Sequence, residues 1–556
     1  MPTQRKPVRR RSLLRVVTLV LAALSLVLTA AAAPRGPGPG DQASWTVAGQ
    51  NVQGDRNQPA EHTVGASNVG SLKVKWAYTT HGDVSATPTV QDGVVYAPDF
   101  GGYLNAIDAA TGTTIWQRKI SDYDGAANAI SRNSPIIVGD ELIVGDLITD
   151  PALHPQGANL IAVNRWTGAL LWIRQVDADP SAKITGSPTE FGGNVYVGVS
   201  SNDELNIYSP PCCTWAGKLV SVNALTGRLN WTFQTIPSSL LKACDSYSPP
   251  TGCGYSGDSI WSTPAIDPRT DSVYFGTGNN YTVTDAANAC EIAARDNHTS
   301  DADCTPPDNL SDSIVSLNLR TGRLNWAHRV FAFDAWPGYC QSLPPGTPCT
   351  LPEGDDYDFG GSGPNIFTAS VNGVRRDLVG VGEKSGFYWT VDAVTGDVVW
   401  DTLAGPGSFY GGIQWGTSTD GRRIYVADAN GEAAPYTLTP SGATTTAGIW
   451  SALDPATGKI LWQTPDPSAT LPIDIGATSV ANGVVYAGSL QPTGDNMFAL
   501  DAATGKILWS FPSGGSVAGG PAIVDGTVYW GSGYSFASFV GGTGNDKLYA
   551  FSLNGR

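Results

Sequence analysis

Residues 500–509 have the sequence LDAATGKILW, the clearest copy of a pattern that organises the chain. In this pattern an apolar residue is followed by Asp or Asn, a short spacer, Thr-Gly, three further residues and Trp. The Asp or Asn and the Thr-Gly pair predict a tight turn in which glycine adopts a positive φ. The terminal Trp is a large flat group that is suited to packing on a neighbouring unit.

The pattern occurs seven times, and the copies end at Trp116, Trp172, Trp231, Trp326, Trp400, Trp462 and Trp509. An eighth copy at residues 548–551 (LYAF) stops before its Trp, but residues 71–76 (SLKVKW) have the alternation of a strand that ends in Trp. Repeats of about 50 to 60 residues with four strands are typical of propeller blades. We therefore predict an all-β, eight-bladed β-propeller at residues 71–556, closed by an N-terminal strand that removes an exposed sheet edge.

The N-terminus has the features of an export signal. An apolar run at residues 16–33 ends in small residues and follows six cations: Arg5, Lys6, Arg9, Arg10, Arg11 and Arg15. We predict a cleaved signal peptide at residues 1–33 and an extension at 34–70 that packs on the propeller. The alternative is an uncleaved membrane anchor, because the run is about as long as a spanning helix requires.

The net charge and the cysteine content of the chain limit the classes of binding partner that we expect. The formal net charge is −16, and removing the six signal cations leaves about −22 on the mature chain. Such a surface disfavours nucleic acid and anionic membranes, whereas neutral substrates or a cationic redox partner such as a cytochrome c fit better. The eight cysteines of an exported chain suggest disulfides of undetermined pairing, and no Cys-x-x-Cys-His haem attachment site is present.

The repeat alone is weak evidence for function, because non-catalytic scaffold propellers share it. The intervals that end at Trp326 and Trp400 are longer and contain cysteines, prolines and polar residues, which indicates loops on one face of the ring. No Ser-His-Asp order and no glycine-rich phosphate loop before a helix stands out. Hydrolysis and nucleotide chemistry are therefore poorly supported.

Between residues 200 and 416 the sequence resembles the pyrroloquinoline quinone (PQQ)-dependent alcohol dehydrogenases, in particular the polyvinyl-alcohol dehydrogenase type. The matching stretches are residues 211–214, 260–264, 276–281, 356–360, 383–386 and 411–416. Through its repeats, nearly the whole mature chain resembles the wider quinoprotein family. The resemblance implies a flat tricarboxylate cofactor with an ortho-quinone, accompanied by Ca²⁺.

The resemblance also implies roles for individual residues. Trp261 matches the Trp that stacks on the cofactor, Arg132 the arginine that binds a carboxylate, and Lys384 the cation near the reactive carbonyl. Thr185 and Ser200 match hydroxyl donors, and the 411–416 stretch adds Gln414 and Trp415 as cofactor contacts. Without a cofactor these are core, surface or cap residues.

For the metal, Asn279 matches a family ligand, and the family's Glu ligand falls on Asp203, with Glu204 beside it. Because Asp is shorter than Glu, the choice between Asp203 and Glu204 stays open. We align Asp356 with the catalytic base and with a metal ligand, and keep Asp358 in reserve. The position after Trp336, where the family has its base, is Pro337 here, and an insertion with Cys340 and Cys349 follows. The alternative is an acidic loop that only keeps the surface soluble.

Adjacent Cys212 and Cys213 match a disulfide of the polyvinyl-alcohol type, although each cysteine could also pair elsewhere or stay free. Altogether the sequence predicts a secreted PQQ- and Ca²⁺-dependent dehydrogenase of secondary alcohols or polyols, with no integral membrane domain after signal cleavage. Because it lacks a haem motif, it would pass electrons to a separate acceptor. The alternatives are a non-catalytic propeller that binds polymer or protein, and a PQQ-dependent sugar dehydrogenase.

Overall fold

Each copy of the repeat forms the two outer strands of a blade and the turn between them. In the first copy, Asp108 ends β5 (Tyr103–Asp108) and its carboxylate accepts hydrogen bonds from the amides of Ala110 and Thr111. Gly112 then adopts a φ of 71°, and β6 (Thr114–Lys119) follows with Trp116 on it. A carboxylate that accepts hydrogen bonds from two following backbone amides has the usual geometry of an Asx turn. Asp108 and Gly112 are therefore both needed to reverse the chain.

The computed structural model describes residues 43–147, 157–205, 211–247, 250–331, 333–335, 357–359, 361–408 and 410–556. The predicted export signal lies outside the described residues, as do Trp336, Pro337, Cys340, Cys349 and Asp356. Residues 43–556 form one unit. Among the described residues, no helix has the length and apolar character needed to cross a membrane.

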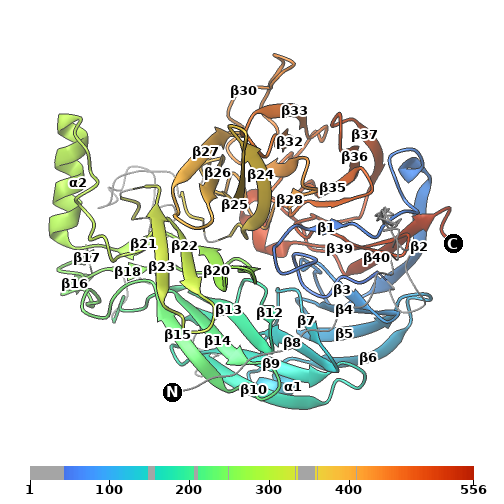
Figure 1. Cartoon of the computed structure of the whole chain (residues 1–556). Helices are drawn as coiled ribbons and strands as arrows, with labels where there is room; N and C mark the ends of the chain where they lie inside the picture. Colours follow the sequence, from blue (N-terminus) through green and yellow to red (C-terminus); the bar gives the residue numbers. More distant parts are fainter. Residues whose placement is uncertain are drawn as a thin grey trace, which may run out of the picture. The chain divides into compact units, whose positions relative to one another are not determined.

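Eight sheets of four antiparallel strands follow one another around a common axis (Figure 1), which confirms the predicted eight-bladed propeller. The first four blades are β3 (Thr89–Gln91), β4 (Val94–Pro98), β5 and β6; β7 (Ile136–Val138), β8 (Glu141–Gly145), β9 (Ala158–Asn164) and β10 (Leu170–Asp177); β12 (Thr189–Phe191), β13 (Asn194–Ser201), β14 (Lys218–Asn223) and β15 (Leu229–Gln234); and β19 (Ala265–Asp267), β20 (Ser272–Gly276), β22 (Ser313–Asn318) and β23 (Leu324–Arg329). The third blade also carries β11 (Ala182–Lys183) beside β13.

The remaining four blades complete the ring. They are β24 (Asn365–Val371), β25 (Val374–Gly382), β26 (Phe387–Asp392) and β27 (Val398–Leu403); β28 (Ser418–Thr419), β29 (Ile424–Asp428), β32 (Ile449–Leu453) and β33 (Ile460–Pro465); β34 (Ser479–Ala481), β35 (Val484–Gly488), β36 (Met497–Asp501) and β37 (Ile507–Phe511); and β38 (Ala522–Val524), β39 (Thr527–Ser532), β40 (Lys547–Leu553) and β2 (Leu72–Thr79). In the last blade the N-terminal β2 pairs antiparallel with the C-terminal β40, from Leu72↔Leu553 to Thr79↔Lys547. The predicted closure by an N-terminal strand is confirmed.

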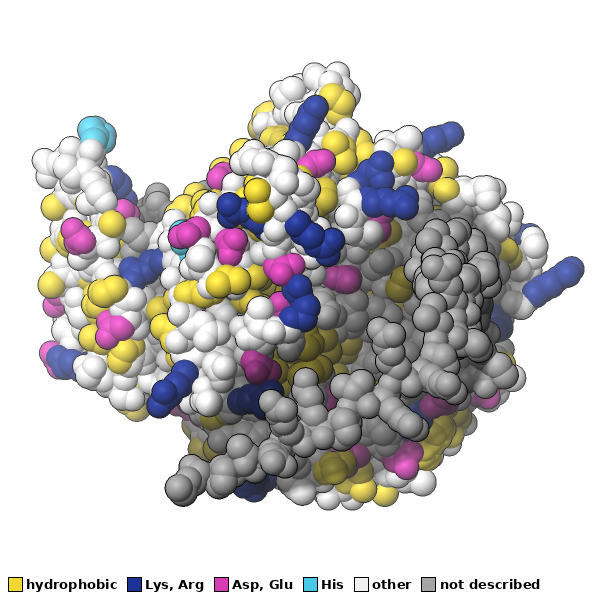
Figure 2. Space-filling model, in the orientation of Figure 1, with side chains coloured by type: hydrophobic (Ala, Val, Ile, Leu, Met, Phe, Trp, Pro, Cys, Tyr) yellow, Lys and Arg dark blue, Asp and Glu magenta, His cyan; other side chains and the backbone are white. Residues whose placement is uncertain are grey.

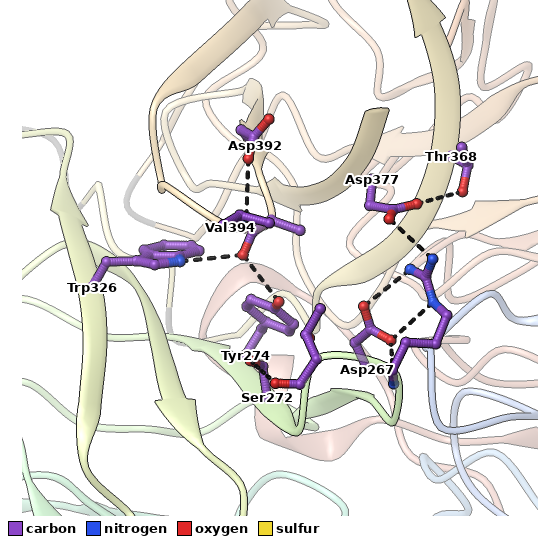
Figure 3. A network of polar contacts seen from close by, with 11 residues as sticks. Asp267, Ser272, Tyr274, Trp326, Thr368, Asp377, Asp392 and Val394 are labelled. Carbon is purple, nitrogen blue, oxygen red and sulfur yellow. Dashed lines mark hydrogen bonds and ion pairs between the residues drawn. The ribbon is translucent and has the colours of Figure 1, made fainter. Parts of the chain in front are cut away.

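The repeat tryptophans join neighbouring blades. The indole N–H of Trp326 donates to the carbonyl of Ala393 in the next blade at 3.2 Å, and the hydroxyl of Tyr274 donates to the same carbonyl at 3.1 Å (Figure 3). The indole also packs on Gly396, where an added Cβ would lie 2.5 Å from the ring. Equivalent indole hydrogen bonds join all eight junctions, including Trp509 to Leu72 and Trp76 to Ala109 at the closure. Beside the Trp326 junction, Arg269 bridges Asp267 and Asp377 of the two blades.

A strap at residues 45–58 crosses one end of the ring. Its backbone pairs with the innermost strands of several blades: Trp45 with Val90, Thr46 with Ile137, Val52 with Ile266, Gln53 with Ile366, Asp55 with Thr419, and Arg56 with Val480. The strap ends in β1 (Asn57–Gln58), which runs parallel to β34. These hydrogen bonds connect blades that are distant in sequence.

The long intervals between repeats contain most of the structure outside the blades. They include β16 (Ser246–Tyr247), β17 (Pro250–Thr251), β18 (Ser256–Gly257), β21 (Asn280–Thr282) and the helix α2 (Asp285–Asn297). The sequence predicted only loops there, but Thr284 caps α2 through the amide of Ala287, and the Cys290–Cys304 disulfide anchors it. A second disulfide joins Cys244 to Cys253.

Short elements elsewhere are η1 (Val69–Ser71), α1 (Ser121–Asp124), η3 (Asp203–Leu205), β30 (Tyr436–Thr437), β31 (Thr444–Thr445) and η5 (Ser535–Val540). On the face drawn in Figure 2, Lys and Arg side chains are scattered among acidic ones.

Candidate active site

A cavity of about 80 Å³ lies where the inner strands of the blades meet. The strap lines it with Gly54 and Arg56, and the guanidinium of Arg56 donates to the carbonyls of Ala48 and Thr478. A second group of lining residues, from four different blades, consists of Arg132, Trp261, Trp415 and Tyr534. The ring therefore brings together side chains such as Arg132 and Tyr534, which are 402 positions apart in the sequence.

Arg132, in the loop before β7, is held by aromatic side chains. Its guanidinium carbon lies 4.2 Å from the ring centre of Trp415, 5.3 Å from that of Phe536 and 5.5 Å from that of Tyr534. One of its nitrogens donates to the Tyr534 hydroxyl at 2.7 Å. Within the described ranges its contacts include no carboxylate within ion-pair distance. A guanidinium fixed on ring faces keeps N–H donors available for an anionic ligand.

Trp261 connects this group to Lys384. Its ring meets Trp415 edge-on, with the centroids 5.1 Å apart and the planes at 76°. The Lys384 ammonium lies 5.0 Å from the Trp261 ring centre and 2.8 Å from a carboxylate oxygen of Asp358. Gly361 runs close to the indole, since a Cβ there would lie 2.5 Å from it. Arg132, Trp415, Trp261 and Lys384 thus form one continuous set of contacts.

The third blade contributes hydroxyls and a cation. The Thr185 and Ser200 hydroxyls lie 2.9 Å apart, and Thr185 lines the cavity. Burial lowers the pKa of Lys183 to about 8, while the carboxylate of Glu204 raises it and the charge of Arg132 lowers it further. The charges of Glu204 and Arg132 therefore both act on the Lys183 ammonium. Lys183 was not among the predicted site residues, and no pattern in its surroundings marks it.

The neighbours Asp203 and Glu204, both in η3, face different groups. Burial raises the pKa of Asp203 to about 6, and the nearby carboxylates Asp179 and Asp177 also raise it. Burial raises the pKa of Glu204 as well, but there Lys183 and Lys384 lower it and Asp358 raises it. The charges of Lys183, Lys384 and Asp358 thus act on Glu204, whereas those of Asp179 and Asp177 act on Asp203.

Asn279 and the paired cysteines lie close to this group. Asn279 is buried, and its side-chain nitrogen donates to the carbonyl of Asn280 at 3.0 Å. The fully buried Tyr281 has its pKa raised by burial and then by the carboxylate of Glu204, which places this segment beside Glu204. Cys212 and Cys213 form a disulfide, and both sulfurs lie 3.7 Å from the carbonyl oxygen of Asp203.

The sequence analysis missed a set of buried carboxylates next to Asp358. Asp312 is fully buried, and among the described residues neither of its carboxylate oxygens has a hydrogen-bond partner. Burial raises its pKa well above the ordinary value, and so do the carboxylates of Asp334, Asp358, Asp258 and Glu383. These acids come from separate loops, so no local pattern could identify the group.

Gln414 and Asp356 are predicted site residues that the described contacts do not connect to the cavity. Gln414 is buried and its side-chain amide donates to the carbonyl of Tyr410 at 2.7 Å, whereas its neighbour Trp415 lines the cavity. Asp356 lies outside the described residues, so its position relative to Lys384 stays a prediction.

The residues present fit the implied cofactor and metal. A ring face, two cations and two hydroxyls are what a flat, anionic quinone needs, and Trp261, Arg132, Lys384, Thr185 and Ser200 supply them. Burial and the charge of the buried Asp358 both raise the pKa of Glu204. Ca²⁺, which prefers carboxylate and amide oxygens, would offset this repulsion.

Comparison with known proteins shows the family to which the chain belongs. Residues 45–406 match the family model described as "PQQ: Glucose/ethanol/alcohol dehydrogenase, beta-propeller domain", and residues 446–555 match a model of the outer membrane protein assembly factor BamB. A polyvinylalcohol dehydrogenase of Sphingopyxis sp. (strain 113P3) is 29% identical, over 88% of this chain and 73% of that protein. One from Pseudomonas sp. is 28% identical, over 92% and 77%.

Solved structures agree on the fold. The quinohemoprotein alcohol dehydrogenase of Comamonas testosteroni has a TM-score of 0.66 at 19% identity, and the match covers 92% of this chain and 81% of that one. The first family model spans more than half of the chain, including Arg132, Trp261 and Lys384. The chain belongs to the family of PQQ-dependent glucose, ethanol and alcohol dehydrogenases with a β-propeller fold.

Proposed function

We propose that the protein is an exported PQQ- and Ca²⁺-dependent dehydrogenase that oxidises secondary alcohols or polyols, as the names of its polyvinylalcohol dehydrogenase relatives suggest. The observation that carries this proposal is the continuous contact of Arg132, Trp415, Trp261 and Lys384 beside the axial cavity. A guanidinium, an indole face and an ammonium held together by three separate blades match the demands of a flat anionic quinone.

The residues have distinct roles in this proposal. When bound between these residues, PQQ would supply the carbonyl carbon that accepts a hydride from the alcohol. Trp261 supports the ring plane, while Arg132 binds a cofactor carboxylate. Lys384 stabilises the negative charge that develops on the quinone oxygen. The alcohol proton goes to the carboxylate of Asp356, or to the reserve Asp358, and a ketone leaves.

Glu204, Asn279 and Asp356 are our proposed ligands for Ca²⁺. Between the two acids of η3 we favour Glu204, because the charges of Lys384 and Asp358 act on its carboxylate, whereas the charges that act most strongly on Asp203 are those of Asp179 and Asp177. With no haem attachment motif in the chain, we propose that electrons pass to a separate acceptor such as a cytochrome c.

A groove on the surface favours the proposal that the substrate is an extended, neutral chain. It has a volume of about 430 Å³, and its lining includes Phe100, Phe536, the polar side chains of Ser121 and Asn128, and the cation Lys119. Phe536 meets Phe100 edge-on at 5.0 Å and also lies 5.3 Å from the Arg132 guanidinium. The groove therefore borders the Arg132 cluster, and its apolar and hydroxyl-binding surfaces suit a chain of methylene and hydroxyl groups.

Reconstitution tests the proposal. Purified protein is incubated with PQQ and Ca²⁺, and dye reduction is followed with secondary alcohols, an oligomeric polyvinyl alcohol and glucose. We expect turnover with the first two substrates and little with glucose. Turnover with glucose alone would support a sugar dehydrogenase. Absence of bound PQQ together with no turnover on any substrate would instead favour a non-catalytic polymer- or protein-binding propeller.

A further inference from the structure

We propose that Tyr281 is a positioning residue for the metal and cofactor site, because its buried side chain holds together the loops that carry Asn279, Glu204 and Trp261. This inference rests on the proposed function, since it concerns the same site. The sequence analysis gave Tyr281 no role, although this residue ends one of the stretches that resemble the family. Only the contacts of its hydroxyl and its ring indicate the role.

The hydroxyl of Tyr281 joins segments that lead into two neighbouring blades. It donates to the carbonyl of Ser201 at 3.3 Å, and it forms a second, short hydrogen bond with the hydroxyl of Ser259. Because a hydroxyl has a single hydrogen, donation to Ser201 makes Ser259 the donor of the second bond. All three residues are buried, so both hydrogen bonds are protected from water.

On one side of this contact, Ser201 leads directly into η3. Ser201 is the last residue of β13, and its hydroxyl accepts a hydrogen bond from the amide of Asp203 at 2.9 Å. Glu204 follows in the same short turn. The Tyr281 hydroxyl therefore holds the carbonyl of the residue whose side chain fixes the start of η3.

On the other side, Ser259 lies two residues before Trp261. The backbones of the two segments are also paired here, since the amide of Asp258 donates to the carbonyl of Asn279 at 2.9 Å. The bond between Ser259 and Tyr281 adds a side-chain contact to this pairing. It connects the segment before the proposed stacking indole to the segment of the proposed metal ligand Asn279.

The ring of Tyr281 contacts the loop of the paired cysteines. It is stacked with the indole of Trp215, with the centroids 6.3 Å apart and the planes at 12°. Trp215 lies two residues after Cys213, and Cys212, Cys213, Trp215 and Tyr281 belong to one buried cluster. Both sulfurs of the disulfide lie 3.7 Å from the carbonyl oxygen of Asp203. Through its ring and its hydroxyl, one side chain thus connects the disulfide loop, η3 and the segment before the stacking indole.

The consequence for metal binding follows from the way in which ligands are held. Groups that orient the ligands of a metal typically contribute about 10- to 100-fold to its affinity. Without its hydroxyl, residue 281 would leave the buried carbonyl of Ser201 and the hydroxyl of Ser259 without this partner. The loops of Glu204 and Asn279 could then shift relative to each other, and Ca²⁺ would be bound more weakly.

The test compares Tyr281→Phe with the matched control Tyr274→Phe in the full-length protein. Tyr274 is also buried, lies in the preceding strand β20, and donates through its hydroxyl to the carbonyl of Ala393 (Figure 3). Both variants should lower the midpoint of thermal unfolding of the apo-protein, because each loses a buried hydrogen bond. Only Tyr281→Phe should weaken Ca²⁺ binding to the PQQ-loaded protein, by about 10-fold or more in a calorimetric titration. Saturating Ca²⁺ should restore its turnover.

Ser259→Ala provides a second variant, which also serves if Tyr281→Phe does not fold by circular dichroism. It removes one of the two hydrogen bonds, so it should weaken Ca²⁺ binding in the same direction but less than Tyr281→Phe does. The double variant should bind Ca²⁺ no more weakly than Tyr281→Phe alone, because the two residues act through one shared contact.

Wild-type Ca²⁺ affinity in both Tyr281→Phe and Ser259→Ala would overturn the inference. An equal loss of Ca²⁺ affinity in Tyr274→Phe would also overturn it, because that result would indicate a general loosening of the fourth blade. The proposed function survives both results, since the wild type still binds PQQ and Ca²⁺. If the wild type binds neither, the proposed function and the inference fail together.

Discussion

At the scale of single residues, the two adjacent acids of η3 give the sharpest prediction. The charges of Lys183, Lys384 and Asp358 act on Glu204, whereas those of Asp179 and Asp177 act on Asp203. We expect Glu204→Gln to weaken Ca²⁺ binding to the PQQ-loaded protein by at least about 10-fold, because a hard cation loses an anionic ligand. Asp203→Asn should have a smaller effect. Calorimetric titration with Ca²⁺ measures the affinity of both variants. A larger loss of Ca²⁺ affinity in Asp203→Asn than in Glu204→Gln would reassign the ligand to Asp203.

Lys384 provides a second prediction at this scale. Lys384→Ala should lower kcat by about 100-fold when PQQ is saturating, because charge developing on the quinone oxygen loses its stabilising cation. Removing Lys384 also leaves the buried Asp358 without this ion pair, so the variant should unfold at a lower temperature. Lys242→Ala, which removes an exposed ion pair with Asp245, is the control and should change neither value. Unchanged kcat in Lys384→Ala would remove Lys384 from the mechanism.

Sequence reasoning identified Arg132, Trp261 and Lys384 because each belongs to a short local motif, and the structure brings these three together. It could not choose between Asp203 and Glu204, since the choice depends on the direction of side chains within one short turn. The sequence did not identify Lys183 and Asp312 as site residues for a different reason. Their significance comes from neighbours on other blades, which no local pattern records.

At the scale of single elements, the repeat glycine is predicted to matter through its contact with the indole of the previous blade. Gly396 and Gly373 have similar φ values, 77° and 79°, but only at Gly396 would a Cβ lie 2.5 Å from Trp326. Gly373→Ala should therefore cost about 1 kcal/mol for its backbone conformation. Gly396→Ala should cost about 1–3 kcal/mol more, because the indole must move.

Thermal unfolding of the two variants side by side measures this difference. Equal midpoints for Gly396→Ala and Gly373→Ala would show that the turn conformation alone, and not docking of Trp326, explains why glycine recurs at this position of the repeat. The blades were predictable because turn and docking requirements recur at fixed spacing in the chain. The helix α2 was not predictable in this way, because its interval breaks the repeat and its position depends on the Cys290–Cys304 disulfide.

At the scale of the whole molecule, closure of the ring by β2 and β40 is predicted to control stability. Thr79 and Lys547 are register partners at the end of this pair, and the Lys547 ammonium donates to the Thr79 hydroxyl at 2.9 Å. A disulfide in Thr79→Cys/Lys547→Cys would close a loop of nearly the whole chain, which restricts the unfolded state. We expect the oxidised double variant to unfold several degrees above either single variant. Identical midpoints would indicate that unfolding does not begin with opening of this pair.

The net negative charge gives a second prediction at the scale of the whole molecule. The formal net charge of −16 favours a cationic electron acceptor, and the rate of electron transfer to such a partner should fall as ionic strength rises. Stopped-flow reduction of a small basic cytochrome c by the substrate-reduced protein, at several salt concentrations, measures this dependence. A rate that is independent of salt would argue against a charge-steered acceptor.

The most direct test of the central claim is the absorption spectrum of the protein loaded with PQQ and Ca²⁺, recorded without oxygen before and after adding a secondary alcohol. The account predicts that one equivalent of PQQ binds and that its spectrum changes to that of the reduced quinol on addition of the alcohol. A folded protein that binds no PQQ, or whose bound PQQ stays oxidised with every secondary alcohol tested, would contradict it.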